Sequence, residues 1–242
     1  MSYIVAIDGP AGSGKGTITK LVAKDLNLVS IDTGMLYRCH ALAVIKNNID
    51  INNEEEVEKI LDKVNINLIN KNNKQIVFLN EEDVTNQIRT PEVNTIVSKT
   101  SAIIGVRNRI TELERKIGYD WLKEGKNIIM EGRDITTVVF PDAKVKIYLD
   151  ATPIERAKRR CKQNKRNGIN QSFEEVLQSI MERDKNDMNK EVGALKKAPD
   201  AVYVDSSKCG VNKVKNKIIN IIKEKTKENK NENHKKNIKS NS

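Results

Sequence analysis

Apolar residues along the chain follow two alternating patterns. Short, mostly apolar runs of the kind that a parallel sheet buries on both faces predict strands. They lie at residues 3–8, 29–31, 127–130, 145–149 and 201–204. Longer stretches with apolar residues three or four positions apart predict helices. These lie at residues 15–26, 34–47, 54–64, 90–124 with a break near Gly105, 153–165, 172–190 and 211–222. The alternation predicts an α/β fold, a parallel sheet of about five strands wrapped by helices.

One region departs from this alternation. Between about residues 50 and 88, two runs at 66–69 and 75–79 flank Asn72-Asn73, which predicts a hairpin, with residues 82–84 as a third strand. We therefore expect a small β insertion in the α/β core. Further along, Ser172 and Glu175 have the spacing of a capping box, which fixes the start of a helix.

The positive charge of the chain is concentrated in two segments. The 242 residues carry a formal net charge of +10. Residues 154–166 hold seven Lys and Arg against one Glu, and residues 208–242 hold eleven Lys against three Glu, whereas the remainder is close to neutral. From about Lys223 the tail has almost no apolar residue, which predicts a disordered basic tail at 223–242.

Composition excludes several classes of protein. Aromatic residues make up 4 %, fewer than a nucleic-acid module built on base stacking needs. Cys39, Cys161 and Cys209 form no CxxC pair, so the sequence predicts neither a disulfide framework nor a zinc site and favours a reducing cytosol. No apolar run approaches the roughly 18 residues of a membrane span. The first residues form an apolar strand rather than a basic leader, so we expect a cytoplasmic protein with no membrane partner.

A glycine-rich segment between the first strand and the first helix is the strongest chemical signal. It consists of Gly9, Pro10, Ala11, Gly12, Ser13, Gly14, Lys15, Gly16 and Thr17. Its glycines allow backbone amides to converge on phosphate oxygens, and the helix N-terminus and Lys15 add positive charge. This is a phosphate-binding loop, or P-loop, because it follows a strand and opens a helix. Alone, it fits a motor, a GTPase or a small kinase equally well.

Further polar residues stand just past predicted strands. Asp32 and Thr33 follow one strand, and Arg133 and Asp134 follow another. Ligands of open parallel sheets bind at the carboxyl ends of the strands, so these residues converge near the P-loop. Arginine suits phosphoryl transfer because its fork holds two phosphate oxygens. The candidate arginines are Arg38, Arg107, Arg133 and Arg183.

With these motifs the chain resembles the bacterial-type cytidylate kinases, from residue 3 to about 222. The P-loop is shared with other nucleoside monophosphate kinases. More specific are Asp32-Thr33-Gly34 with Tyr37-Arg38, Ile88-Arg89-Thr90, Gly132-Arg133-Asp134 running on to Val138-Val139-Phe140-Pro141-Asp142-Ala143, Glu155-Arg156-Ala157 with Arg159-Arg160, and Arg183-Asp184 with Asp187.

The resemblance implies transfer of the γ-phosphoryl group of ATP to CMP or dCMP, giving CDP or dCDP and ADP, with Mg²⁺ as cofactor. The acceptor phosphate is already ionised, so no general base is needed. It also implies a monomer, free nucleotides as partners, no nucleic acid, and a P-loop fold with an inserted NMP-binding subdomain and a short helical lid. The implied segments are core 1–37, NMP-binding region 38–98, core 99–152, lid 153–168, core 169–222 and tail 223–242.

Roles of individual residues also follow from the resemblance. Lys15, Arg133, Arg183, Arg156 and Arg160 would neutralise charge on the moving group, and the P-loop with Arg156 would bind ATP. Thr33, Tyr37, Arg38 and Arg133 would hold the acceptor phosphate, and Arg183 and Asp187 the sugar hydroxyls. Ser98, Arg107 and Asp134 would contact cytosine, because a carboxylate accepts from the exocyclic amine that uracil lacks.

The lid and two departures complete the comparison with the family. Arg156, Arg159 and Arg160 in the basic segment would fold over the triphosphate and exclude water. Lys190 stands where the family usually has an arginine. Glu131 stands where related kinases often have an aspartate, and it would reach Mg²⁺ through water.

Two other functions remain open from the sequence. A small-molecule kinase acting on an alcohol would need a carboxylate base, which Asp32 could supply. A nucleic-acid-binding protein would use the basic tail and show strongly salt-dependent binding.

Overall fold

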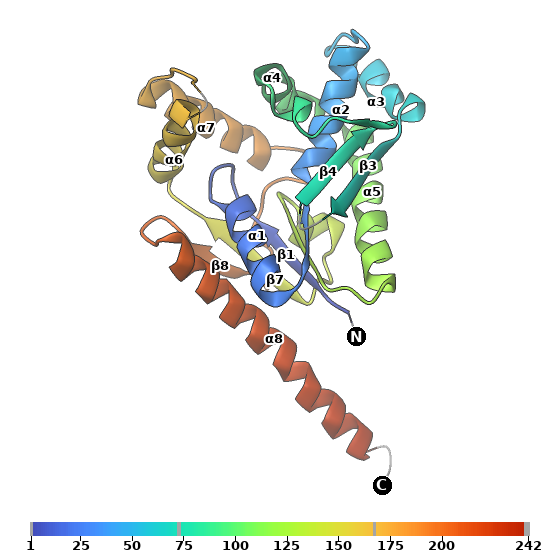
Figure 1. Cartoon of the computed structure of the whole chain (residues 1–242), viewed down its shortest axis with the longest axis vertical. Helices are drawn as coiled ribbons and strands as arrows, with labels where there is room; N and C mark the ends of the chain where they lie inside the picture. Colours follow the sequence, from blue (N-terminus) through green and yellow to red (C-terminus); the bar gives the residue numbers. More distant parts are fainter. Residues whose placement is uncertain (1, 72–73, 167, 240–242) are drawn as a thin grey trace.

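A five-stranded parallel sheet forms the centre of the protein, in a computed structural model that describes residues 2–71, 74–166 and 168–239 (Figure 1). The strand order is β2-β6-β1-β7-β8. The strands are β1 (Ile4–Asp8), β2 (Val29–Asp32), β6 (Ile128–Gly132), β7 (Val145–Asp150) and β8 (Val202–Asp205). All neighbouring pairs are parallel, which confirms the predicted α/β sheet.

The register of the sheet places the ends of β1, β2 and β6 side by side along one edge. Asp8 at the end of β1 lies opposite Gly132 of β6, and Asp32 at the end of β2 lies opposite Glu131. Because the strands are parallel, their carboxyl ends meet at one edge. The P-loop, Asp32-Thr33 and Arg133-Asp134 all follow strands at this edge.

Helices cover both faces of the sheet, so the central strand β1 is buried on both sides. Ile4 and Ala6 pack into a core with α2 (Gly34–Lys46) and α5 (Ile104–Lys123). Val5 and Ile7 pack into a second core with α1 (Lys15–Leu26) and α8 (Val211–Lys239). This two-sided burial accounts for the continuous apolar run at the start of the chain.

The predicted insertion is a small antiparallel sheet beside β2. It contains α3 (Glu54–Lys63), β3 (Ile66–Lys71), β4 (Lys74–Leu79), β5 (Glu82–Asp83) and the 3₁₀ turn η1 (Gln87–Arg89). The Gln75 side chain fixes it to the core, since its Oε1 accepts from Asp32 N at 3.0 Å and its Nε2 donates to Ser30 O. The expected turn at Asn72-Asn73 lies outside the described residues.

Two helices form the region expected to be the lid. α6 (Pro153–Arg166) and α7 (Phe173–Met188) pack against each other through Ala157, Val176 and Ile180. The predicted capping box is confirmed, because Ser172 and Glu175 bond each other's backbone amides. Asn167, expected to help end α6, lies outside the described residues.

The predicted helix break near Gly105 is confirmed, and it lies at residues 101–103 rather than at Gly105 itself. α4 (Pro91–Thr100) ends three residues before α5 begins at Ile104, so Gly105 lies inside α5. The break places the Ser101 carbonyl where the Arg107 guanidinium bonds it at 3.3 Å. A π-helical turn, η2 (Ile135–Val139), was not predicted.

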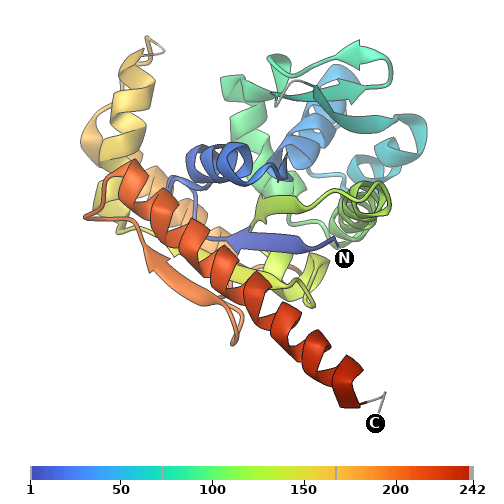
Figure 2. The same cartoon turned by 60° about the horizontal axis from the view of Figure 1, so that its bottom comes forward.

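The end of the last helix also differs from the prediction. α8 continues to Lys239, whereas the sequence predicted a helix to about Ile222 and a disordered tail. The apolar first half of α8 is anchored on the core, so the extension needs no new nucleation, and lysine and glutamate are good helix formers. Figure 2 shows the far end of α8 projecting past the rest of the chain. Residues 240–242 lie outside the described part.

None of the helices in the described part of the chain is long and apolar enough to cross a membrane.

Candidate active site

The P-loop connects β1 to α1, and its backbone depends on glycine. A Cβ at Gly9 would stand 2.0 Å from the Leu149 carbonyl oxygen of the neighbouring strand, so no side chain fits there. Gly14 caps α1 with φ 97°, a left-handed conformation that glycine adopts without strain. The loop can therefore pass close to β7 and turn its amides toward a phosphate at the start of α1.

Lys15 lies across this loop and is almost fully buried. Its ammonium donates to the carbonyl oxygens of Gly9 at 2.6 Å and Pro10 at 2.9 Å. Burial, and then the charge of Arg133, lower the pKa of Lys15 to about 7. An arriving phosphate group would restore the charged form, because an adjacent anion favours the ammonium.

Asp8 is a site residue that the sequence analysis missed. It is fully buried and accepts from the backbone amides of Ile135 at 2.9 Å and Thr136 at 2.7 Å, and from the Thr136 hydroxyl at 2.6 Å. It thereby ties the end of β1 to η2, the turn that begins after Asp134. Burial raises the pKa of Asp8 although these hydrogen bonds oppose the shift. The only sequence signal is one acidic residue ending an apolar strand.

Two carboxylates stand beside Lys15 at the ends of β6 and β2. Glu131 accepts from the Thr19 hydroxyl at 2.9 Å, and the Thr33 hydroxyl donates to the Glu131 carbonyl at 3.0 Å. Burial, and then the facing charge of Asp32, raise the pKa of Glu131 to about 7, against the opposing effect of Lys15. The Glu131 Oε1 lies 3.4 Å from where a Gly16 Cβ would stand, so its carboxylate reaches the start of α1.

A buried ion pair joins two of the residues expected to contact the base. Arg107 of α5 donates to Asp134 Oδ2 at 2.5 Å, and both side chains are almost fully buried. The Arg107 guanidinium also stands 5.3 Å above the centre of the Tyr37 ring. Thus the structure brings together Tyr37, Arg107 and Asp134, which come from three distant segments.

Two further residues expected to bind the acceptor lie on α2 and α4. Arg38 donates to Asn94 Oδ1 at 2.6 Å and to the Ile88 carbonyl at 3.4 Å. Ser98 is half-buried, and its hydroxyl has no hydrogen-bond partner within the described residues.

The Asp187 carboxylate on α7 contacts three cationic side chains. Its carboxylate contacts Arg133 Nε at 2.9 Å, Lys190 Nζ at 2.9 Å and Arg183 Nε at 4.0 Å. Burial would raise the pKa of Asp187, but Arg133 and Lys190 hold it well below its usual value. Lys190 also donates to the Ser101 hydroxyl at 3.2 Å, so α7 is linked to the break between α4 and α5.

The three lid arginines have different environments. Arg156 is buried, forms a two-pronged pair with Asp184, and donates to the carbonyls of Ala151 at 2.9 Å and Ala11 at 3.1 Å. Arg159 donates to the Ser13 carbonyl at 3.2 Å. Both therefore brace the P-loop from its outer side.

Of the three, Arg160 is the exposed one, and it lies near Arg38 and Arg183. Its charge is among those that lower the pKa values of Arg38 and Arg183, although burial is the main cause for both. The pKa of Arg183 falls to about 10, with Arg133 as the second cause. These cations therefore lie close enough together for their charges to affect one another.

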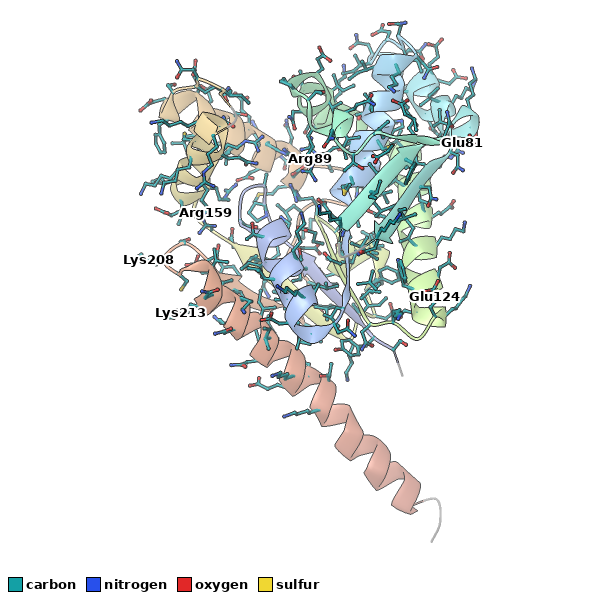
Figure 3. The ribbon with its side chains drawn as sticks, in the orientation of Figure 1. Glu81, Arg89, Glu124, Arg159, Lys208 and Lys213 are labelled. Atoms are coloured by element: carbon teal, nitrogen blue, oxygen red, sulfur yellow. The ribbon has the colours of Figure 1, made fainter. Side chains whose placement is uncertain are left out.

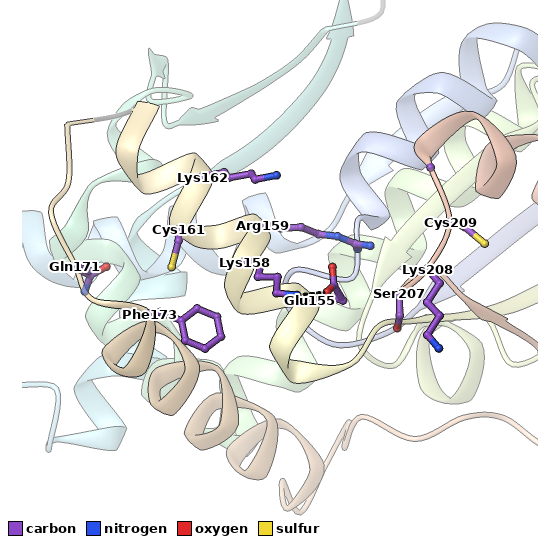
Figure 4. Close-up of a pocket in the computed structure, with 11 residues that line it drawn as sticks. Glu155, Lys158, Arg159, Cys161, Lys162, Gln171, Phe173, Ser207, Lys208 and Cys209 are labelled. Carbon is purple, nitrogen blue, oxygen red and sulfur yellow. Dashed lines mark hydrogen bonds and ion pairs between the residues drawn. The ribbon is translucent and has the colours of Figure 1, made fainter.

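A pocket of about 750 Å³ lies beside the braced P-loop (Figure 4). Its walls come from α6, the start of α7 and the loop before α8, and they include Lys158, Arg159, Lys162 and Lys208. Arg159 and Lys208 lie on the same side of the molecule in Figure 3. Four cationic side chains against one carboxylate, that of Glu155, make the pocket basic.

Within the described residues, no cluster of three or more His, Cys, Asp or Glu side chains could hold a metal ion by itself.

The parallel sheet, the P-loop and the facing arginines define a P-loop fold of the nucleoside monophosphate kinase type.

Comparisons with known proteins identify the family. A model of the family described as cytidylate kinase matches residues 5–224. The chain is 41 % identical over 215 residues to the cytidylate kinase of Carboxydothermus hydrogenoformans, covering 89 % of this chain and 95 % of the relative. It is 44 % identical over 217 residues to that of Fusobacterium nucleatum subsp. nucleatum, covering 90 % and 95 %. The chain belongs to the cytidylate kinase family.

Proposed function

We propose that this protein transfers the γ-phosphoryl group of ATP to CMP or dCMP, giving ADP and CDP or dCDP. The observation that carries the proposal is the buried Arg107–Asp134 pair beside the acceptor-side arginines, at the same sheet edge as the P-loop. This arrangement offers one site for a polyphosphate and another for a base with its phosphate.

The base pocket would distinguish cytosine from uracil. Asp134 has one oxygen bonded to Arg107 and a second that can accept from the exocyclic amine of cytosine. Uracil has a carbonyl oxygen at that position and would face the carboxylate with like polarity. Such a missing hydrogen bond between buried groups gives strong discrimination.

The chemistry would rest on positioning and charge. The nucleophile is an acceptor phosphate oxygen that is ionised at neutral pH, so no general base is required. Lys15 would neutralise the donor phosphates, and Arg133, Arg183 and Arg160 the acceptor and the group in transfer. Arg133 bonds Asp187 through Nε and the Gly132 carbonyl through one terminal nitrogen, so its other terminal nitrogen can contact the substrate phosphate.

The carboxylates beside Lys15 fit a magnesium ion held with the nucleotide. Glu131 reaches the start of α1, and Asp32 faces it across the sheet. One or two carboxylates plus substrate phosphates is the usual set for Mg²⁺, which keeps several waters. The ion would neutralise charge on the β- and γ-phosphates. Its arrival would also return Glu131 to its ionised form.

The lid arginines divide their roles in this proposal. We propose that Arg156 and Arg159 hold the P-loop in shape, and that Arg160 approaches the phosphates. The basic pocket beside Arg159 would receive the rest of the ATP molecule. The division of the chain into core, acceptor-binding region 38–98 and lid 153–168, the monomeric state and the cytoplasmic location stay predictions.

A coupled assay of ADP release tests the function. We expect turnover with CMP and dCMP to exceed that with UMP, AMP and shikimate. Preference for shikimate would favour the alcohol kinase with Asp32 as base. Removal of residues 223–242 should leave nucleotide turnover unchanged, whereas strongly salt-dependent RNA binding that disappears with this segment would favour the nucleic-acid alternative.

A further inference from the structure

The outer edge of β2 is held by a side chain of the β insertion. β2 is the first strand in the order of the central sheet and pairs with β6 on one side, so its other edge has no strand partner in the described part of the chain. On that edge the Asp32 amide donates to Gln75 Oε1 at 3.0 Å, and Gln75 Nε2 donates to the Ser30 carbonyl. The Gln75 side chain thus satisfies backbone groups that an edge strand leaves open.

The pattern of these two bonds is that of a parallel sheet. A residue in a neighbouring parallel strand donates to the carbonyl of the residue before its partner and accepts from the amide of the residue after it. Ser30 and Asp32 stand in this relation to Ile31, and the primary amide of Gln75 offers the same donor and acceptor as a peptide group. Gln75 therefore takes the place of one paired residue of a further strand.

A second side chain of the insertion supports the same contact. Asn70 of β3 lies opposite Gln75 of β4 in the register, and its Nδ2 donates to the Ser30 carbonyl at 3.3 Å. A carbonyl oxygen has two lone pairs, so it can accept from both amides. The insertion is thereby joined to the carboxyl end of β2, the end that lies at the candidate active site.

The turn that follows β2 carries residues of that site. Asp32 Oδ1 accepts from the Gly34 amide at 3.1 Å, at the start of α2. The Thr33 amide and hydroxyl donate to the Glu131 carbonyl at 3.2 and 3.0 Å. Glu131 therefore fixes this turn from within the sheet, and Gln75 fixes it from the outer edge.

We propose that Gln75 is a positioning residue of the acceptor site. It fixes the end of β2, and through it the turn at Asp32 and Thr33, so that Thr33 meets the acceptor phosphate. The β insertion then contributes to the reaction through a contact made outside the substrate. This inference rests on the proposed function, because it assumes an acceptor phosphate at Thr33.

Gln75→Met in the full chain tests the inference, because methionine matches glutamine in length but can form neither bond. We expect the Kd of CMP, measured by calorimetry, to rise by about 10-fold, since two lost hydrogen bonds are worth about this much. The Kd of ATP should change by less than about twofold. The matched control is Gln87→Met, because the Gln87 amide bonds Glu82 within the insertion, and this variant should bind CMP like the parent.

Cytidine separates positioning from a general disturbance of the acceptor region. It lacks the phosphate, so its inhibition constant against CMP phosphorylation reports the base and sugar contacts alone. We expect this constant to change by less than about twofold in Gln75→Met. Equal weakening of CMP and cytidine would overturn the inference, as would unchanged CMP binding.

Hydrogen exchange of the Asp32 amide, measured by NMR on the parent, gives a second test that needs no variant. An amide on the outer edge of an edge strand exchanges rapidly unless a partner holds it. We expect this amide to be protected, and rapid exchange would overturn the inference even if Gln75→Met does not fold. Failure of the proposed function is a different result, since a parent protein without CMP phosphorylation would show it before any variant is made.

Discussion

Two buried arginine–aspartate pairs, one on each side of the P-loop, have different surroundings. In the lid, every side-chain nitrogen of Arg156 has a partner, shared between Asp184 and the carbonyls of Ala151 and Ala11. In the region expected to bind the base, Arg107 contacts Asp134 and the Ser101 carbonyl, but its Nε has no partner within the described residues.

The polar groups that neighbour the two pairs also differ in whether they have hydrogen-bond partners. Around Arg107, the polar groups of Tyr37, Ser98 and Glu114 are buried and also lack partners in the described part of the chain. A complete set of hydrogen bonds fixes the lid helix to the P-loop and leaves Arg156 few free donors for a substrate. An incomplete set marks the side on which a polar ligand can complete it. We therefore assign structure to the first pair and recognition to the second.

Lys15→Ala should give the largest effect. It tests on the P-loop whether a buried polar group with few protein partners acts on the substrate rather than on stability. The Lys15 ammonium has only two carbonyl partners, and burial lowers its pKa to about 7, so the folded protein gains little from its charge. We expect kcat to fall by about 10²- to 10³-fold, as when a group that stabilises transition-state charge is removed. The temperature of unfolding should change little. The matched control is Lys20→Ala on the exposed face of α1, and unchanged turnover would remove Lys15 from the site.

Asp134→Asn and Asp184→Asn compare the two pairs directly. The first substitution removes the charged acceptor for the cytosine amine, so the KM for CMP should rise by about 10- to 100-fold while the KM for ATP stays within about twofold. The second weakens a structural pair, so unfolding should lose about 2 kcal/mol, or about 4–8 °C, with little change in the KM for CMP. Steady-state kinetics and thermal unfolding of both variants decide. Equal losses of CMP affinity would abolish the distinction.

Much of this site could be predicted from the sequence because it follows strand ends. Lys15, Thr33, Arg133 and Asp134 come together since parallel strands deliver their carboxyl ends to one edge. The capping box at Ser172 was predictable for a similar reason, because it depends on residues only three positions apart.

What the sequence did not predict depends on contacts between distant segments. Asp8 has its role only because η2 packs against the end of β1 and supplies the amides that its carboxylate accepts from. Arg156 was expected over the triphosphate, and its pair with Asp184 could not be foreseen before α6 was placed against α7. The end of α8 was misjudged because low apolar content was taken to prevent a helix that its anchored half already supports.

Arg156→Lys should give the smallest effect and separates bracing from catalysis. Lysine keeps the charge but cannot hold Asp184 with two prongs while also bonding the Ala11 carbonyl. If Arg156 acts only through the P-loop, the KM for ATP should rise by about threefold, and kcat and the KM for CMP should change by less than about twofold, as for one weakened hydrogen bond. If the guanidinium instead contacts the group in transfer, as the family resemblance implies, kcat should fall by about 10²-fold or more. A change mainly in the KM for ATP would therefore identify Arg156 as a structural support, as its geometry indicates. A change mainly in kcat would identify it as a catalytic residue.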